Sequence, residues 1–248
     1  MVVGTVTIAN LCDLECDIGH VDGRLGHPGR YIGMCGRFVQ RYTWDDIQEL
    51  YDLPDGPARN LPTHYNIAPS DPVEVMRPAA NDAAELVSMR WGLIPWWWKK
   101  PLKQMPASFN ARAETVADKP MFRDAFQRHR CVIPASGYYE WLKAPDGRQP
   151  YFISAADGSV LSFAGLWDRW KNPETGEPVI SCTIIVTFAC GSVFTVGKWR
   201  SSEIPLLNKI RMVSLLQPKN PYCSGPALPE RRCGFDSALS MRHTIFQS

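Results

Sequence analysis

The pattern of apolar and polar residues predicts a central domain built mainly from short strands. Apolar residues recur in short runs, several of them with a period of two, as in strands with one buried face. Gly, Pro and Asp punctuate the gaps, and APDGRQP (144–150) and AADGS (155–159) are typical of hairpin turns. The predicted strands are PVEVM (72–76), ELVSMRWGLI (85–94), RCVIPASGYYEWL (130–142), PYFISA (150–155), VLSFAGLWDRW (160–170) and SCTIIVT (181–187).

Two segments have helical rather than strand periodicity. In TWDDIQELYDL, Thr43 is a candidate N-cap, acidic residues fill the first turn, and Ile47, Leu50 and Tyr51 recur at helical spacing. In KPMFRDAFQR (119–128), Met121 and Phe122 share a face with two later apolar residues. We therefore predict an α+β fold whose strands form a mostly antiparallel, partly closed β-barrel with flanking helices. The sequence has no glycine-rich phosphate loop and no repeated βα unit, which disfavours nucleotide-binding α/β folds.

The two ends of the chain differ from this centre. Residues 1–33 are rich in glycine and show no periodicity, so we expect a disordered extension or one that precedes the true start of the protein. Residues 34–187 form the predicted domain. In residues 188–248, proline and serine interrupt every apolar stretch, and we expect a divergent, poorly ordered tail.

Composition narrows the class of protein. With 45% hydrophobic and 21% charged residues, and no apolar run near the roughly 18 residues that span a bilayer, no membrane insertion is expected. Residues 1–33 lack the apolar core of a secretory signal, so we expect an intracellular protein, in the cytoplasm and nucleoid or in a nucleus. The 8 cysteines are scattered, which favours reduced thiols. Cys12, Cys16, His20 and His27 match no common zinc-finger spacing, so no metal and no cofactor are predicted.

Charge gathers locally although the net charge is only +2. The stretch from Arg90 to Arg130 holds nine basic residues against Glu114, Asp118 and Asp124. Within it, PWWWKK places consecutive tryptophans beside lysines, and such a combination can stack on bases while its cations follow a phosphate backbone. The basic stripe therefore favours a nucleic-acid partner.

The pair Met34-Cys35 looks like the start of a protein. A cysteine with a free α-amine is a special reagent, because that amine has a pKa near ~7.7, is partly neutral at pH 7 and can attack an aldehyde. The neighbouring thiol then closes a thiazolidine ring. An internal cysteine cannot do this, because its nitrogen belongs to an amide. The alternative is that Cys35 is an ordinary buried thiol.

Several motifs, in this order, resemble the SRAP domain, the family of abasic-site processing proteins also called SOS-response-associated peptidases: MCGRF, THYNIAP, RWGLIPWWW, SFNARAET, MF, CVIPASGYYEW and PYFI. The resemblance covers roughly residues 34–187. It implies the SRAP barrel fold, single-stranded DNA with an abasic site as ligand, and a stable covalent protein–DNA crosslink as product. It also implies a DNA-damage role and an autopeptidase activity that exposes Cys35.

The resemblance assigns roles to residues one by one. Cys35 matches the nucleophile, Asn110 the active-site asparagine and Glu140 the catalytic glutamate. Arg37 and Arg112 match the arginines that hold phosphates beside the crosslink. Trp97 and Trp98 match the base-contacting pair, with Pro69 and Met121 as wedges against the base stack. For Met121, a place in the core is equally open. The protein is expected to act as a monomer.

The sequence departs from the family after residue 187. Family members continue to a histidine in an H-x-R-x-P motif that assists sugar ring opening and crosslink reversal. Here only His243 follows, without that motif. We therefore expect a domain that is incomplete at its C-terminal end and less stable than a full one. Three functions stay open: an abasic-site crosslinking enzyme with lyase-like chemistry, a thiol peptidase or amidohydrolase, and a noncatalytic single-stranded DNA binder.

Overall fold

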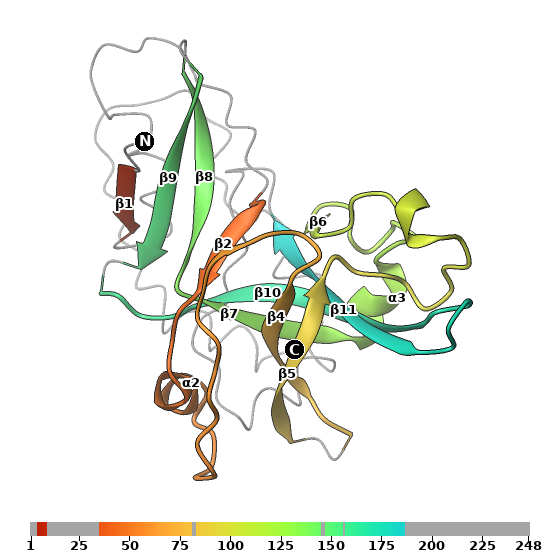
Figure 1. Ribbon diagram of the computed structural model, residues 1–248, viewed down its shortest axis with the longest axis horizontal. Coiled ribbons are helices and arrows are strands. Elements are labelled where there is room, and N and C mark those ends of the chain that lie inside the picture. The colour runs from red at the N-terminus through yellow and green to blue at the C-terminus, as the bar shows by residue number, and fades with distance from the viewer. Residues whose placement is uncertain (1–3, 9–34, 81–82, 145–146, 156, 187–248) are drawn as a thin grey trace, which may run out of the picture. The chain divides into compact units, whose positions relative to one another are not determined.

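The computed structural model describes residues 4–8, 35–80, 83–144, 147–155 and 157–186, which form two β-sheets with short helices beside them (Figure 1). All of these elements belong to one compact unit, Met1–Asn208. The predictions for Met34, for the tail 188–248 and for the possible zinc ligands at positions 12, 16, 20 and 27 lie outside the described residues.

Five strands of the larger sheet close into a barrel. Their order is β10-β7-β4-β5-β11, and β11 pairs back with β10. Every pair is antiparallel except β5–β11, so the predicted fold class is confirmed. The bounds are β4 (Pro72–Pro78), β5 (Ala84–Trp91), β7 (Arg130–Ala135), β10 (Leu161–Lys171) and β11 (Pro178–Val186). The short strand β6 (Asn110–Arg112) adds to the far end of β11 in parallel.

A glycine in the longest strand of the barrel is closely surrounded by its neighbours. Gly165 of β10 is paired with Cys131 on one side and with Ile184 on the other. A Cβ atom at this position would lie 2.9 Å from Ile133 Cδ1 and 3.0 Å from Cys131 Sγ. Only glycine lets these neighbours fill the interior at this point, since close-packed cores leave no room for an added methyl group.

The second sheet has the order β1-β9-β8-β2-β3. Its strands are β1 (Gly4–Ile8), β2 (Arg37–Gln40), β3 (His64–Ile67), β8 (Gly137–Ala144) and β9 (Gly147–Ala155). The pair β1–β9 is parallel and the other pairs are antiparallel. The apolar pattern did not predict β1, β2, β3 or β6, because each is only three to five residues long.

The predicted helix after Thr43 is confirmed as α2 (Trp44–Tyr51). The Thr43 hydroxyl accepts from the Asp46 backbone N–H, and the Asp46 carboxylate accepts from the Thr43 N–H, which makes a complete capping box. Ile47 and Tyr51 are the buried residues of this helix. The second helix is shorter than predicted, because α3 covers only Arg123–Arg128 and Met121 lies in the turn before it. A 3₁₀ turn, η1, spans Leu102–Gln104.

Two strand predictions need correction. RCVIPASGYYEWL was predicted as one strand, but it breaks at Ser136 into β7 and β8, which belong to different sheets. AADGS was predicted as a hairpin turn, but it connects β9 in one sheet to β10 in the other. APDGRQP does join a hairpin, because β8 and β9 pair antiparallel up to Ala144 and Gly147.

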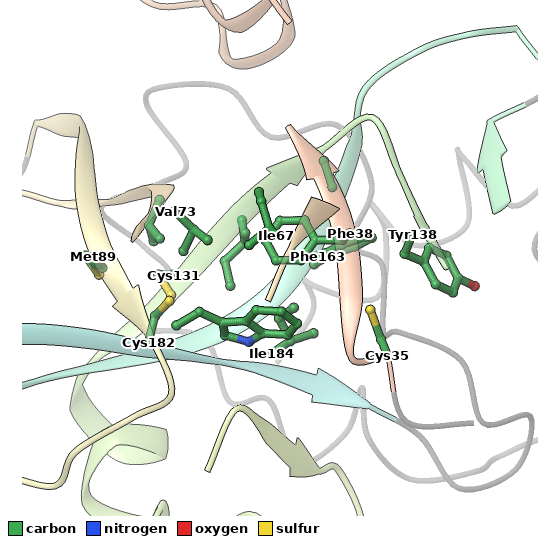
Figure 2. Packing of buried hydrophobic residues seen from close by; sticks show 14 of the residues in the cluster. Cys35, Phe38, Ile67, Val73, Met89, Cys131, Tyr138, Phe163, Cys182 and Ile184 are labelled. Atoms are coloured by element: carbon green, nitrogen blue, oxygen red, sulfur yellow. The ribbon is translucent and has the colours of Figure 1, made fainter. Parts of the chain in front are cut away.

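Both sheets contribute to one hydrophobic core (Figure 2). Phe38 of β2 packs edge-on against Trp91 of β5, at 4.9 Å between ring centroids, and against Phe163 of β10, at 5.9 Å. Cys35 belongs to the same cluster, with none of its surface exposed. Figure 2 shows Cys35 beside Tyr138 at one end of the cluster and Met89 at the other. The expected nucleophile is therefore fixed against the domain core.

The described part of the chain lacks two further kinds of feature. It contains no helix that is both long and apolar enough to cross a membrane. In the same residues, no three His, Cys, Asp or Glu side chains gather as metal ligands would.

Candidate functional site

The structure brings the three predicted catalytic residues to one place. Cys35 precedes β2, Asn110 begins β6, and Glu140 lies in β8. The Asn110 side-chain amide donates a hydrogen bond of 2.8 Å to the Cys35 carbonyl oxygen. Glu140 is close enough to Cys35 to affect the pKa of its thiol. Asn110 and Cys35 thus meet although they are 75 positions apart in the chain and belong to the two different sheets or their flanks.

Asn110 is held in position from the barrel. The residue before it, Phe109, accepts hydrogen bonds at its carbonyl oxygen from the Trp91 indole N–H (2.8 Å) and from the Ile184 backbone N–H (3.1 Å). Trp91 is completely buried. Trp91 was not predicted to support the site. A signal was present in the motif RWGLIP, because a buried tryptophan needs a hydrogen-bond partner for its N–H.

Glu140 has the most unusual electrostatics of the group. Burial raises the pKa of its carboxyl from 4.5 to about 8, and a hydrogen bond from the Trp141 backbone acts in the opposite direction. At pH 7 this carboxyl therefore holds its proton in most molecules. Its neighbour Tyr139 is paired with Arg37 on β2, which fixes the strand that carries Glu140 beside the strand that follows Cys35.

Two acceptor atoms at this place have no hydrogen-bond partner within the described ranges. They are Glu140 Oε1 and Asn110 Oδ1, and both are buried. Buried polar atoms without partners are uncommon in native proteins and destabilise the fold. Both atoms are therefore available to a ligand that offers hydrogen-bond donors.

The Cys35 thiol itself is neutral in this state. Burial raises its pKa well above the ordinary value, the Glu140 carboxylate raises it further, and a backbone hydrogen bond from Arg37 lowers it less. The Cys35 Sγ lies 3.7 Å from the Arg37 carbonyl oxygen, the acceptor of its weak hydrogen bond. The thiol is therefore not poised as a thiolate nucleophile.

Arg37, a predicted phosphate ligand, contacts β3. The Arg37 guanidinium donates to the Asn66 side-chain oxygen at 3.0 Å, and the adjacent Tyr65 is 61% exposed. A hollow lined by Thr63–Ile67, Asp71 and Pro72 lies here. Asn66 and Tyr65 were not singled out from the sequence, although both belong to the quoted motif THYNIAP.

Pro69 lies in the tight turn that follows this hollow. The turn closes with a hydrogen bond from the Asp71 N–H to the Ala68 carbonyl (3.0 Å), and the Asp71 carboxylate accepts from the Ala68 N–H (2.8 Å). Ser70 has φ +86°, which is a strained conformation for a residue with a Cβ. Pro69 itself is half-buried.

The tryptophan motif forms a turn after β5 that the barrel holds at both ends. The Trp98 N–H donates to the Pro95 carbonyl at 2.9 Å. Asp168 of β10, which is 3% exposed, accepts from the Trp96 N–H at 2.9 Å. The Trp170 indole donates to the Trp98 carbonyl at 2.7 Å. Asp168 was not predicted as a site residue, although a carboxylate inside an apolar strand is a recognisable signal in the sequence.

The tryptophan side chains of this turn differ in exposure. Trp96 is 57% exposed, and its indole donates to Asp124 in the first turn of α3 at 3.2 Å. Trp97 and Trp98 are half-buried, with ring centroids 6.2 Å apart and planes tilted by 54°. Both expected base-contacting rings therefore reach solvent in part.

The basic stripe is less uniform than the sequence indicated. Arg90 is half-buried and donates to the Gly92 carbonyl and to the Ser70 hydroxyl. Arg130 is buried and donates to the Phe126 carbonyl at 2.7 Å. These two arginines serve the fold. The exposed cations of the stripe are Lys99, Lys100, Lys103, Arg112, Lys119, Arg123 and Arg128. Met121 is half-buried, and its role stays a prediction.

Comparison with known proteins places this site in a family. The SOS response associated peptidase (SRAP) family matches residues 34–205. The chain therefore belongs to the SRAP family, as its motifs predicted. The match runs past residue 187, and the domain boundaries given above stay predictions.

The chain is similar to bacterial and vertebrate proteins. The chain is 39% identical over 160 residues to the abasic site processing protein YoqW of Bacillus subtilis, which covers 62% of this chain and 68% of that protein. It is 35% identical to the abasic site processing protein YedK of Escherichia coli, over 54% of this chain and 59% of that one. It is 29% identical to the abasic site processing protein HMCES of Xenopus tropicalis, over 61% and 57%.

A solved structure supports the fold. The crystal structure of a Bordetella bronchiseptica protein matches with a TM-score of 0.53 and 27% sequence identity. The match covers 62% of this chain and 72% of that one.

Proposed function

We propose that this protein processes abasic sites in single-stranded DNA by bonding covalently to them through Cys35. The observation that carries the proposal is the meeting of Cys35, Asn110 and Glu140, with a hydrogen bond from Asn110 to Cys35 and a protonated Glu140 beside the thiol. Relatives that are named abasic site processing proteins support the choice of substrate.

The reaction uses both functional groups of an N-terminal cysteine. The free amine of Cys35 attacks the aldehyde carbon of the ring-opened sugar, and loss of one water gives an imine. The thiol sulfur then adds to the imine carbon, and the thiol proton goes to the nitrogen. The product is a thiazolidine ring, and the net change is the loss of one water molecule with no oxidation or reduction.

Glu140 is the proton donor and acceptor in this scheme. With a pKa of about 8, its carboxyl gives a proton to the departing hydroxyl at pH 7 and recovers one afterwards, which suits general acid–base catalysis. Asn110 orients the cysteine, because its amide already holds the Cys35 carbonyl. Its unpaired Oδ1 is available to accept from the attacking amine or from a sugar hydroxyl.

The reaction requires a chain that begins at Cys35. The nitrogen of Cys35 is part of an amide as long as Met34 precedes it, and an amide nitrogen does not attack aldehydes. Hydrolysis of the bond between residues 34 and 35, the peptidase activity in the family's description, frees the amine and leaves a carboxylate on Met34. Removal of an initiator methionine at position 34 has the same result.

DNA is held by cations and rings around this centre. Arg37 and Arg112 contact phosphates, since the guanidinium fork suits them. Trp97 and Trp98 contact bases, and Pro69 and Met121 act as wedges against the stacked bases. Bases must be unpaired to reach these rings, which favours single-stranded DNA. The protein acts inside the cell as a monomer.

The test uses a single-stranded oligonucleotide with one abasic site. The chain beginning at Cys35 should form an adduct that survives denaturing electrophoresis, Cys35→Ala should form none, and Glu140→Gln should form it at least tenfold more slowly. Cys131→Ala, which removes another buried thiol, is the matched control and should keep the adduct. An adduct with Cys35→Ala would refute the proposal.

A second candidate, DNA binding without chemistry, is favoured by the complete burial of Cys35 in the full chain. It predicts salt-dependent binding of single-stranded DNA but no adduct, even with the chain that begins at Cys35.

A further inference from the structure

The strand β1 lies upstream of the matched family residues and occupies a sheet edge of the domain. Gly4–Ile8 pairs in parallel with Tyr151–Ala155 of β9, residue for residue, and the other side of β9 pairs with β8 (Figure 1). Without β1, β9 would be the last strand of this sheet.

The sequence of β9 is typical of a strand at the edge of a sheet. Pro150 lies within it, and proline is confined to edge strands and strand starts because it has no N–H to donate. The stretch after it, YFISA (151–155), contains no charged residue and no further proline. An uncharged edge of this kind readily pairs with another strand. The pairing with β1 begins at Tyr151, directly after the proline.

The partner segment has a matching character. GTVTI (4–8) is uncharged, and four of its five residues are Thr, Val or Ile, the residues most favoured in strands. The segment that connects β1 to Cys35 is long enough that it does not force β1 against β9. β1 is three strand positions from β2, about 15 Å, whereas residues 9–34 extended would reach roughly 90 Å.

We propose that residues 4–8 stay bound to β9 as its edge strand after the chain is cut before Cys35. The N-terminal segment then acts as a noncovalent partner peptide, recognised by strand addition to the edge Tyr151–Ala155. Cleavage frees the amine of Cys35 while the edge stays covered. Only the cleavage step rests on the proposed function; the contact is independent of DNA.

The test uses the full chain with a site-specific protease sequence substituted for residues 17–22 and a fluorophore on the N-terminus. After cutting, the labelled fragment should co-elute with the domain in size-exclusion chromatography. The matched variant carries Thr5→Pro together with Val6→Pro. Successive N–H groups of a strand face opposite edges, so one of the two prolines removes a donor that faces β9. This variant should release the fragment, whereas Thr5→Val should retain it.

Hydrogen exchange gives a second measurement. Among residues 151–155, the alternate amides that face β1 should be equally protected before and after cutting and at least tenfold less protected in the proline variant, whereas the amides that face β8 should stay protected in both. Release of the fragment from the parent chain, or retention by the proline variant as well, would overturn the proposal. Because no DNA is involved, failure here leaves the crosslinking reaction untouched, and absence of a crosslink leaves this contact untouched.

Discussion

Replacement of Glu140 by glutamine should change the pH dependence of stability in a specific window. In the folded protein, burial raises the pKa of the Glu140 carboxyl from 4.5 to about 8. Between these two pH values the unfolded chain releases this proton and the folded chain keeps it. The folded state therefore binds more protons, and the contribution of Glu140 to stability falls as pH rises.

The magnitude follows from the size of the shift. A difference of about 3.5 pH units at 1.36 kcal/mol per unit corresponds to about 5 kcal/mol. This contribution is fully present below pH 4.5, is lost progressively up to about pH 8, and is constant above that. A loss of this size is comparable with the whole stability of many domains, at about 5 to 15 kcal/mol. Glutamine has no proton to lose and should show none of it.

Urea unfolding followed by tryptophan fluorescence, repeated from about pH 4 to pH 9, measures the effect. The free energy of unfolding of Glu140→Gln minus that of the parent should rise by about 1.4 kcal/mol per pH unit inside the window. Contributions of all other groups cancel in this difference. Glu177→Gln, at an exposed carboxylate of the β10–β11 hairpin, is the matched control for a Glu-to-Gln replacement outside the site. A flat difference for Glu140→Gln would show that Glu140 is ionised in the folded protein and refute the reasoning.

Three further perturbations test other parts of the structure. Asp168→Ala leaves the Trp96 N–H without its acceptor. It should lower the free energy of unfolding in urea by about 1–3 kcal/mol and weaken single-stranded DNA binding. Unchanged binding would contradict the positioning role of Asp168. Gly165→Ala places a Cβ 2.9 Å from a core side chain and should lower stability by about 1–3 kcal/mol in thermal unfolding; a neutral effect would count against the barrel packing. Arg37→Ala should weaken DNA binding and reduce the slope of log affinity against log salt by about 1, while Asn66→Ala, which removes only the partner of Arg37, should leave that slope unchanged.

The sequence predicted the barrel because its strands are long and apolar. β4, β5, β10 and β11 each run for seven residues or more, which is enough for periodicity to appear. Two of the three strands that position the site, β2 and β6, are short, and only β8 is long. β6, with three residues, carries Asn110 and is a strand only because β11 offers its edge, so no local pattern could reveal it. β1 depends in the same way on the distant edge of β9.

Asn110 and Glu140 were predicted only through family motifs, whereas Cys35 after Met34 and the tryptophans of PWWWKK were recognised from their own chemistry. Nothing local distinguishes Glu140 from an exposed glutamate at a strand end; its raised pKa comes from burial that tertiary packing creates. Likewise, the support of Trp91 behind Asn110 needs the closed barrel. Asp168 was not predicted either, although a carboxylate inside an apolar strand requires a partner and could have been recognised from the sequence alone.

The measurement that tests the central claim most directly is the intact mass of the covalent complex. The protein is incubated with the abasic oligonucleotide, and the adduct is isolated under denaturing conditions. Its mass should equal that of residues 35–248 plus the oligonucleotide minus one water, and fragmentation should place the DNA on Cys35. An adduct that retains Met34, or one attached to any other residue, would contradict the account.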